Sequence, residues 1–361
     1  MPQNEIHKRR GRLPSIEVVD LFCGIGGLSY GMKSEGFKIL AGFDLDWTCQ
    51  YAYETNNEAK FIFKDIRTVR KEDITHFYSK ESIKVLAGCA PCQPFSSYAF
   101  KNKNKDKEKY NLLYEFGRLV KDIHPDIVTM ENVPAIASFK LQSVLGDFVK
   151  TLECEGYHVS YRVVYCPDYG IPQTRKRLVL LASRLGDIEL ISPTHQKENY
   201  LTVRDVIGSL PPLQAGEECP TDALHRCRTL SPLNMQRMMA TPYGGSWKDW
   251  PEELLLECHK KEGGKSFGSV YGRMVWDEPA PTMTTLCTGI GNGRFGHPEQ
   301  NRAISAREAA LFQTFPVTYK FFPNEQEVSL AKASRYIGNA VPPRLGEVIA
   351  KSIKLHIRTH K

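Results

Sequence analysis

Four side chains that could act together on a substrate each lie beside an apolar, strand-like run of the sequence. They are a thiol, a carboxylate and two guanidinium groups, contributed by Cys92, Glu131, Arg175 and Arg177. A thiolate can add to an electron-poor atom, a carboxyl group can donate a proton, and two arginines can bind a planar polar group or a phosphate. These residue types predict a nucleophilic cysteine with an acid and two cations beside it. Taken alone, the two arginines would instead indicate a solvated basic turn.

Cys92 also forms a Cys-x-x-Cys pair with Cys89, which is consistent with two other kinds of site. A structural zinc site needs four ligands, and the sequence contains no second pair of this type. A redox pair of the thioredoxin type opens a helix, which Pro91 and Pro94 would interrupt. A further set of zinc-ligand types does not match the spacing of a common zinc finger: Cys219, His225, Cys227, Cys258 and His259. We therefore favour the nucleophile and expect no metal.

A glycine-rich segment predicts a cofactor pocket near the thiol. The run Ile16–Phe22 leads into Cys23-Gly24-Ile25-Gly26-Gly27, where glycines let a ligand approach the backbone. Ser29 replaces the third glycine of the dinucleotide fingerprint, and no Lys-Ser/Thr pair follows, so a pyrophosphate is not favoured. Asp44 and Asp65 follow the next two strand-like runs, where a carboxylate can accept hydrogen bonds from ribose. Such a loop can be purely structural, but three consecutive strand ends favour S-adenosylmethionine, which has ribose and adenine but no phosphate.

Apolar runs separated mostly by helix-length segments must position these groups. Five of them predict βαβ units and a parallel sheet: Ile16–Phe22, Lys38–Phe43, Phe61–Phe63, Lys84–Gly88 and Ile127–Met130. Tyr157–Val164 and Leu178–Ser183 are joined by a loop rather than a helix, which predicts an antiparallel edge. We therefore expect an α/β fold with a Rossmann-like sheet of about seven strands. Helices are expected over Leu112–Ile123, Ser305–Gln313 and Arg344–Ile357.

The stretch from Leu185 to Arg302 differs from the rest, because periodicity fades and prolines and glycine pairs become frequent. It predicts an inserted, smaller, loop-rich module. We expect residues 1–14 to be a basic tail, residues 15–184 to form the first part of a catalytic domain, and residues 303–361 to return to that domain with a C-terminal helix.

The composition is that of a globular protein, with 361 residues, 41% of them hydrophobic, and a net charge of +7. No apolar run reaches the roughly 18 residues of a membrane helix, and no apolar stretch follows the basic N-terminus, so we expect neither a membrane protein nor a secreted one. Ten cysteines are too few for a disulfide scaffold, which indicates a reducing cytoplasm. The positive charge permits a polyanionic partner.

Six short motifs then occur in the order typical of one enzyme family. They are Phe22-Cys23-Gly24-Ile25-Gly26-Gly27, Pro91-Cys92-Gln93, Glu131-Asn132-Val133, Gln173-x-Arg175-x-Arg177, Arg307-Glu308-Ala309-Ala310 and Gly338-Asn339-Ala340-Val341-Pro342. In these motifs the chain resembles the S-adenosylmethionine-dependent cytosine-C5 DNA methyltransferases of the microbial modification type. The match covers residues 15–184 and 303–355, and it implies that residues 185–302 are the target-recognition domain.

The resemblance implies a role for each of the four reactive side chains. Cys92 would add to C6 of cytosine, which makes C5 nucleophilic enough to attack the methyl group of S-adenosylmethionine. Glu131 would hydrogen-bond the N3 and N4 edge of the base. Arg177, and with it Arg175, would hold the O2 side against developing charge.

The same resemblance implies a set of cofactor-binding residues: Phe22, Gly24, Ile25, Gly27, Asp44, Asp65, Ile66, Pro91, Leu112, Asn339 and Val341. Because Asn339 lies far along the chain, the C-terminal helix must fold back against the first strand. The sequence departs from the family at Leu45, where some members have an aromatic residue, and at Cys89, where glycine is frequent.

Double-stranded DNA is the implied substrate, with the target cytosine flipped out of the stack. In the family the loop after Pro-Cys-Gln holds the vacated helix, and here it carries Lys101, Lys103, Lys105, Lys107 and Lys109. Lysines that contact phosphates would make binding weaken with salt, although a solvated loop has the same composition. We expect a monomer in the cytoplasm, associated with the nucleoid, and a restriction endonuclease that acts separately.

Three other functions remain to be compared with this one. A tRNA methyltransferase of the same family is the nearest, although the large variable module favours duplex DNA. A thiol-disulfide or nicotinamide oxidoreductase is disfavoured by Ser29, Pro91 and Pro94. A DNA-binding regulator without activity would not need Cys92 and Glu131 together.

Overall fold

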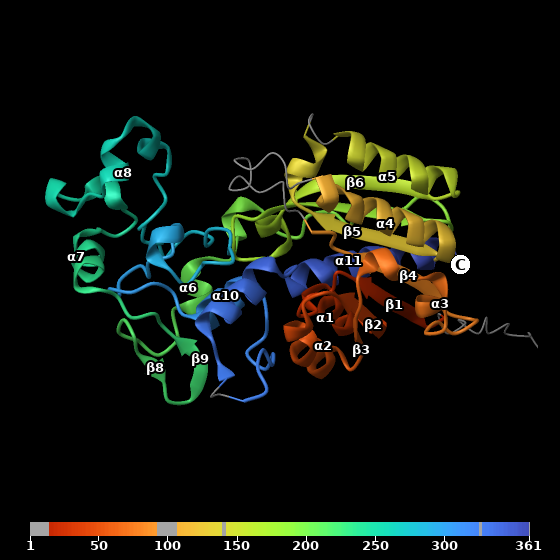
Figure 1. Cartoon of the computed structure of the whole chain (residues 1–361), viewed down its shortest axis with the longest axis horizontal. Helices are drawn as coiled ribbons and strands as arrows, with labels where there is room; N and C mark the ends of the chain where they lie inside the picture. Colours follow the sequence, from red (N-terminus) through yellow and green to blue (C-terminus); the bar gives the residue numbers. More distant parts are fainter. Residues whose placement is uncertain (1–13, 92–106, 139–141, 325–326, 361) are drawn as a thin grey trace, which may run out of the picture.

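The structure is a computed structural model that describes residues 14–91, 107–138, 142–324 and 327–360 (Figure 1). Cys92 lies outside the described residues, and so do Lys101, Lys103 and Lys105 of the expected DNA-contacting loop. Within the described part of the chain, no helix is both long and apolar enough to cross a membrane.

A seven-stranded sheet forms the centre of the larger part of the molecule (Figure 1). Its strands are β1 (Ile16–Leu21), β2 (Lys38–Asp44), β3 (Lys60–Phe63), β4 (Ile83–Gly88), β5 (Ile127–Asn132), β6 (His158–Tyr165) and β7 (Lys176–Ser183). They are ordered β3-β2-β1-β4-β5-β7-β6, and all pairings are parallel except those of β7 with β5 and β6. The predicted α/β fold, its seven strands and its antiparallel edge are confirmed.

The described helices cover both faces of this sheet and build the region beside it. They are α1 (Gly27–Ser34), α2 (Gln50–Asn57), α3 (Lys71–Thr75), α4 (Lys107–Ile123), α5 (Gln142–Cys154), α6 (Val203–Ile207), α7 (Pro232–Ala240), α8 (Glu257–Lys260), α9 (Ala306–Phe312), α10 (Leu330–Asn339) and α11 (Pro343–His360). Successive side chains of a strand point to opposite faces, so β1 contributes to two cores. Val18 packs in the core that includes α1 and α11, and Val19 in the core that includes α4 and α5.

The chain order reverses between β1 and β4, because β2 and β3 lie on one side of this pair and β5 on the other. Ligands of open α/β sheets bind at the carboxyl ends of the strands at such a switch point. β1 ends at Leu21 and β4 ends at Gly88, so the glycine-rich segment and the Cys-x-x-Cys segment both follow strands that end here.

The position of Asn339 led us to expect the C-terminal helix against the first strand, and in the structure α11 packs on α1, the helix that follows that strand. A methyl group on Gly31 would lie 2.0 Å from the carbonyl oxygen of Pro343 and 2.8 Å from Cα of Gly346, so only glycine allows the two helices to approach this closely. This contact brings the final part of the chain to the amino end of α1, beside the glycine-rich segment.

The region between β7 and α9 is rich in loops and contains the small hairpin of β8 (Glu218–Cys219) and β9 (Asp222–Arg226). Much of it lies beside the sheet rather than on it (Figure 1). However, Ile188 and Val203 at its beginning and Met283 near its end pack in the core shared with α1 and α11. The division of the chain at residues 185 and 302 therefore stays a prediction, since the main core continues across both positions.

Replacing Gly31 with Ala should destabilise the protein, because the backbone of α11 would have to move to admit the methyl group. Overpacking of this kind costs about 1–3 kcal/mol. Gly146→Ala in α5 is the matched control: its methyl group would meet no atom within 4 Å, and alanine is favoured over glycine in a helix by about 0.5–1 kcal/mol. Thermal unfolding measures both changes. An unchanged melting temperature for Gly31→Ala would contradict the close packing.

Candidate active site

A cavity of about 800 Å³ lies at the carboxyl ends of β1, β2, β4 and β5. The residues that follow these strands form one side of it. Two stretches that are distant in sequence, residues 282–286 and residues from Arg335 to Val341, contribute the other side. The cavity therefore occupies the switch point of the sheet, where the sequence predicted a cofactor and a reactive thiol.

The carboxylate of Asp44 holds the glycine-rich loop. Its Oδ2 accepts a hydrogen bond from the backbone N–H of Gly24 over 2.8 Å, and its Oδ1 accepts one from Asp46 N–H over 2.8 Å. Burial raises the pKa of Asp44, although the two hydrogen bonds favour its charged form and act in the opposite direction. Gly24 has a φ of +51°, and a methyl group on Gly27 would lie 2.2 Å from the carbonyl oxygen of Val341. The loop is thus fixed to β2 on one side and to the segment after α10 on the other.

Asp20 is a cavity residue that our sequence reasoning missed. It lies one residue before the end of β1, is 1% exposed, and accepts a hydrogen bond from the hydroxyl of Ser29 over 2.6 Å. Burial raises the pKa of Asp20 to about 7, and the nearby charge of Asp44 adds to the shift. Ser29, which excluded the dinucleotide fingerprint, therefore has a structural role as the partner of a buried acid. The sequence shows only an acidic residue within a strand-like run, which does not reveal its burial or its contact with Ser29.

Two of the predicted site residues, Glu131 and Arg177, lie side by side in the structure. Nε of Arg177 lies 2.8 Å from Oε1 of Glu131, whose side chain is 3% exposed. Oε2 of Glu131 accepts a hydrogen bond from Sγ of Cys89 over 2.8 Å. A carboxylate, a guanidinium and a thiol therefore meet in one wall of the cavity.

Arg175 lines the same cavity, but its guanidinium is occupied by backbone carbonyls. It is 2% exposed and donates to Met283 over 3.0 Å and to Gly338 and Ala340 over 3.4 Å. Burial lowers the pKa of Arg175 to about 10, and the positive charge of Arg177 contributes. In this arrangement Arg175 ties the start of β7 to both distant segments, and its contact with a base stays a prediction.

Most of the residues implied as cofactor contacts line the cavity together: Phe22, Gly24, Ile25, Gly27, Asp44, Ile66, Pro91, Leu112, Asn339 and Val341. Asp65 does not line it. Its carboxylate accepts hydrogen bonds from the backbone and the side chain of Arg67, which lowers the pKa of Asp65. Leu45, at the position where some family members have an aromatic residue, also lines the cavity and is 54% exposed.

Further wall residues come from segments in which the sequence pattern was uninformative. They are Thr282, Met283, Thr284, Thr285, Leu286, Asn292, Arg335 and Tyr336. Arg335 pairs with Asp46, and the hydroxyl of Tyr336 donates to the carbonyl of Thr48 over 2.9 Å, so α10 is fixed to the segment after β2. Gln313 was also missed: it donates to the carbonyl of Ala340 over 2.7 Å and supports the same wall.

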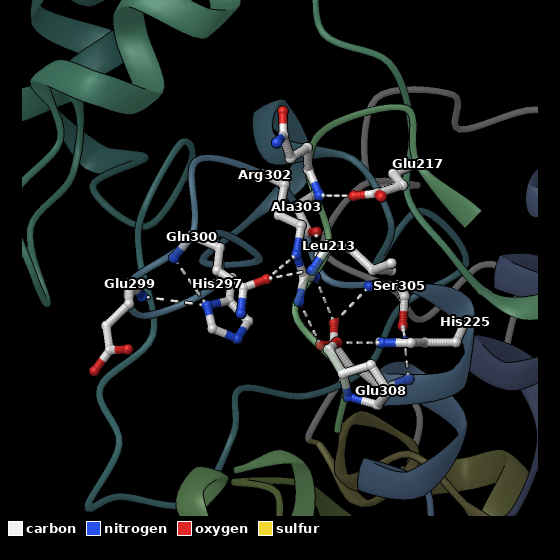
Figure 2. A network of polar contacts seen from close by, with 12 residues as sticks. Leu213, Glu217, His225, His297, Glu299, Gln300, Arg302, Ala303, Ser305 and Glu308 are labelled. Carbon is white, nitrogen blue, oxygen red and sulfur yellow. Dashed lines mark hydrogen bonds and ion pairs between the residues drawn. The ribbon is translucent and has the colours of Figure 1, made fainter. Parts of the chain in front are cut away.

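The Arg-Glu-Ala-Ala motif forms two ion pairs that join α9 to the loop-rich region. Both terminal guanidinium nitrogens of Arg302 donate to Glu308, at 2.8 and 2.7 Å, and each residue is 1% exposed (Figure 2). Although burial opposes ionisation, Arg302 lowers the pKa of Glu308. Glu308 also accepts the N–H of Ser305 over 2.6 Å, and the neighbouring Arg307 pairs with Asp222 in β9. The motif is thus explained by packing rather than by contact with the cavity.

Among the described residues, no three His, Cys, Asp or Glu side chains are grouped so that they could hold a metal ion. The cysteines and histidines of the loop-rich region have other contacts: Cys219 and Cys227 pack in a small apolar cluster, and the ring of His259 stacks on Trp247 with centroids 4.0 Å apart.

The fold and the cavity define an α/β enzyme that binds a ligand at the switch point of its sheet, with an acid, a cation and a thiol in the wall. The sequence model of the C-5 cytosine-specific DNA methylases matches residues 16–355, and the chain belongs to this family. It is 55% identical over 337 residues to the type II methylase M.HgiDII of Herpetosiphon aurantiacus, covering 93% of this chain and 94% of that protein. It is 32% identical over 349 residues to the type II methyltransferase M.PspPI of Psychrobacter sp. strain TA137, covering 94% and 79%.

Solved structures show the same fold. A putative DNA modification methyltransferase encoded within a prophage of E. coli superposes with a TM-score of 0.74 at 22% identity, covering 95% of this chain and all of that one. A DNMT2 variant of Spodoptera frugiperda superposes with a TM-score of 0.65 at 17% identity, covering 94% and 100%.

The protein is therefore a DNA cytosine-C5 methyltransferase, as the six motifs predicted. Membership of this family implies S-adenosylmethionine as the methyl donor and DNA as the substrate. It also decides against the oxidoreductase and against a regulator without activity.

Replacing Asp20 with Asn should make stability less dependent on pH. Because the pKa of Asp20 is raised to about 7, the folded protein holds a proton that the unfolded chain loses near pH 4, and wild-type stability declines as the pH rises between these values. Asparagine keeps an oxygen for Ser29 and cannot ionise. The melting temperature of Asp20→Asn minus that of wild type should therefore increase from about pH 5 to pH 8. A constant difference across this range would contradict a protonated Asp20.

Proposed function

We propose that the protein methylates C5 of a flipped-out cytosine, in one short sequence context of double-stranded DNA, through a covalent adduct with Cys92. The observation that carries this proposal is that the Glu131–Arg177 pair and the glycine-rich loop line one cavity. A base and a methyl donor could therefore meet there. Pro91, the residue before Cys92, is part of the same wall.

The cavity suits S-adenosylmethionine in size and in chemistry. Its volume of about 800 Å³ is that of a small-molecule site. A methyl group on Gly24 would meet no atom within 4 Å, so the loop leaves open space beside its backbone. Oδ1 of buried Asp20 has no hydrogen-bond partner among the described residues and is available to a ligand or a water. When bound, the cofactor supplies an electrophilic methyl group.

The residues that would hold the cofactor are those of the wall shared by β1, β2 and the segment after α10. Phe22 and Ile25 would contact its apolar parts, Asp44 the ribose, and Asn339 and Val341 the opposite side. The resemblance to the family implies Asp65 as a further contact, and the ion pair of Asp65 with Arg67 would have to open for this residue to bind the cofactor.

The reaction needs a nucleophile because C5 of cytosine is unreactive. The thiolate of Cys92 adds to C6, and the electron pair displaced toward C5 takes the methyl group. A base then removes the C5 proton, the C5–C6 double bond re-forms, and the thiolate leaves. Glu131 binds the N3 and N4 edge and supplies a proton to N3 as the thiolate adds, so that negative charge does not build up on the ring. The same group takes this proton back when the thiolate leaves. Arg177 lies beside that carboxylate and would hold O2.

The substrate side of the site would be completed by the loop-rich region and the lysine-rich segment. We infer that residues 185–302 read the DNA sequence and that the lysines between Lys101 and Lys109 contact phosphates. Both relatives described above are type II enzymes by name, which supports a restriction–modification system with an endonuclease that acts separately. We expect the methyltransferase to act as a monomer.

Incubation of the protein with S-adenosylmethionine and unmethylated genomic DNA, followed by bisulfite sequencing, tests this function. Cytosines should be protected in one short recurring context. Cys92→Ala should abolish the protection but leave cofactor binding unchanged by calorimetry, because the thiol acts on the base and not on the cofactor. Substantial turnover by Cys92→Ala would contradict the covalent route, and protection only of cytosines in added tRNA would replace DNA as the substrate.

A further inference from the structure

Cys89 occupies a position where glycine is frequent in the family, and its side chain reaches the active-site carboxylate. It directly follows β4, and its N–H donates to the carbonyl of Leu21 over 3.2 Å, which extends the β1–β4 pairing by one residue. The half-buried side chain lines the cavity, and its Sγ donates to Oε2 of Glu131 over 2.8 Å. The backbone therefore fixes this thiol beside the end of β5.

The two oxygens of Glu131 are contacted from opposite neighbours of β5. Oε1 lies 2.8 Å from Nε of Arg177 on β7, and Oε2 is bound by Cys89 after β4. Two further ionisable groups are close enough to interact electrostatically with this carboxylate: buried Arg175 and buried Cys166. With 3% of Glu131 exposed, water has little access to take the place of either contact.

We propose that Cys89 is a positioning residue for methyl transfer, whose thiol fixes the orientation in which the carboxyl group of Glu131 meets the base. The proposal rests on the function proposed above, in which Glu131 binds the N3 and N4 edge of cytosine. The terminal torsion of a glutamate is broad, so one contact from Arg177 leaves the carboxylate free to turn. The contact from Cys89 removes that freedom before the base arrives, which lowers the barrier to the reaction itself.

A thiol suits this role because it is a weak donor. Oε2 keeps lone pairs for the amino group of the base, and the bond to sulfur is readily lengthened when the base enters. Alanine or glycine at position 89 would leave this oxygen without the contact. Serine would keep a donor on a shorter side chain and should restore part of the effect.

Steady-state methylation of a duplex that contains the target context tests the proposal in four variants. Cys89→Ala and Cys89→Gly should each lower kcat by about threefold to tenfold, with unchanged Kd for S-adenosylmethionine and little change in KM for DNA. Cys89→Ser should recover part of the lost kcat. Cys154→Ala, which removes an exposed thiol in α5, is the matched control and should behave as wild type.

A double-mutant cycle with Glu131→Gln separates positioning from general disturbance of the site. Single-turnover methylation over long incubations should show a smaller effect of Cys89→Ala in the Glu131→Gln background than in wild type, because the contact has already been changed. An equal effect in both backgrounds, a wild-type kcat for Cys89→Ala, or a serine variant no better than alanine would overturn the role of Cys89. Absence of 5-methylcytosine with the wild-type protein would instead overturn the proposed function itself.

Discussion

The reversed direction of β7 is the constraint on which the active site depends. In this antiparallel pairing Leu178 lies opposite Asn132, so the residues before Leu178 emerge at the carboxyl end of β5. Arg177 can therefore reach Glu131, and Arg175 can reach the segments that close the cavity. Had β7 run parallel to β5, both arginines would lie at the opposite edge of the sheet. The antiparallel edge is thus the reason that Arg177 lies beside Glu131 in the cavity wall.

The second requirement is that the end of the chain returns to its beginning. Gly31 allows α11 to pack on α1, and Gly27 lets Val341 approach the glycine-rich loop. Arg175 and Gln313 then bind the carbonyl of Ala340 from two other directions. Contacts made at these four points hold one wall of the cavity, so the cofactor side and the base side of the site are parts of one packed structure.

The sequence was most informative where a residue's role follows from its position on a strand. β1 and β5 are buried along their whole length, so each reads as a mostly apolar run, and both were predicted to within two residues. Residues at the ends of these strands line one cavity, because the carboxyl ends of parallel strands meet at one edge of the sheet.

Contacts between distant segments could not be read from the same pattern. Asp20 looks like an ordinary strand residue, and only the fold shows it buried against Ser29. The wall formed by residues 282–286 comes from a stretch without periodicity. Such features depend on tertiary packing, which local spacing does not encode.

Covalent trapping tests the central claim most directly. The wild-type protein would be incubated with S-adenosylmethionine and a duplex carrying 5-fluorocytosine at the target position, where fluorine cannot be removed as the C5 proton is. The account predicts a denaturation-stable complex in which peptide mapping finds the methylated base attached to Cys92. Methylation of the ordinary duplex with no trapped complex, or attachment to another cysteine such as Cys89, would contradict it.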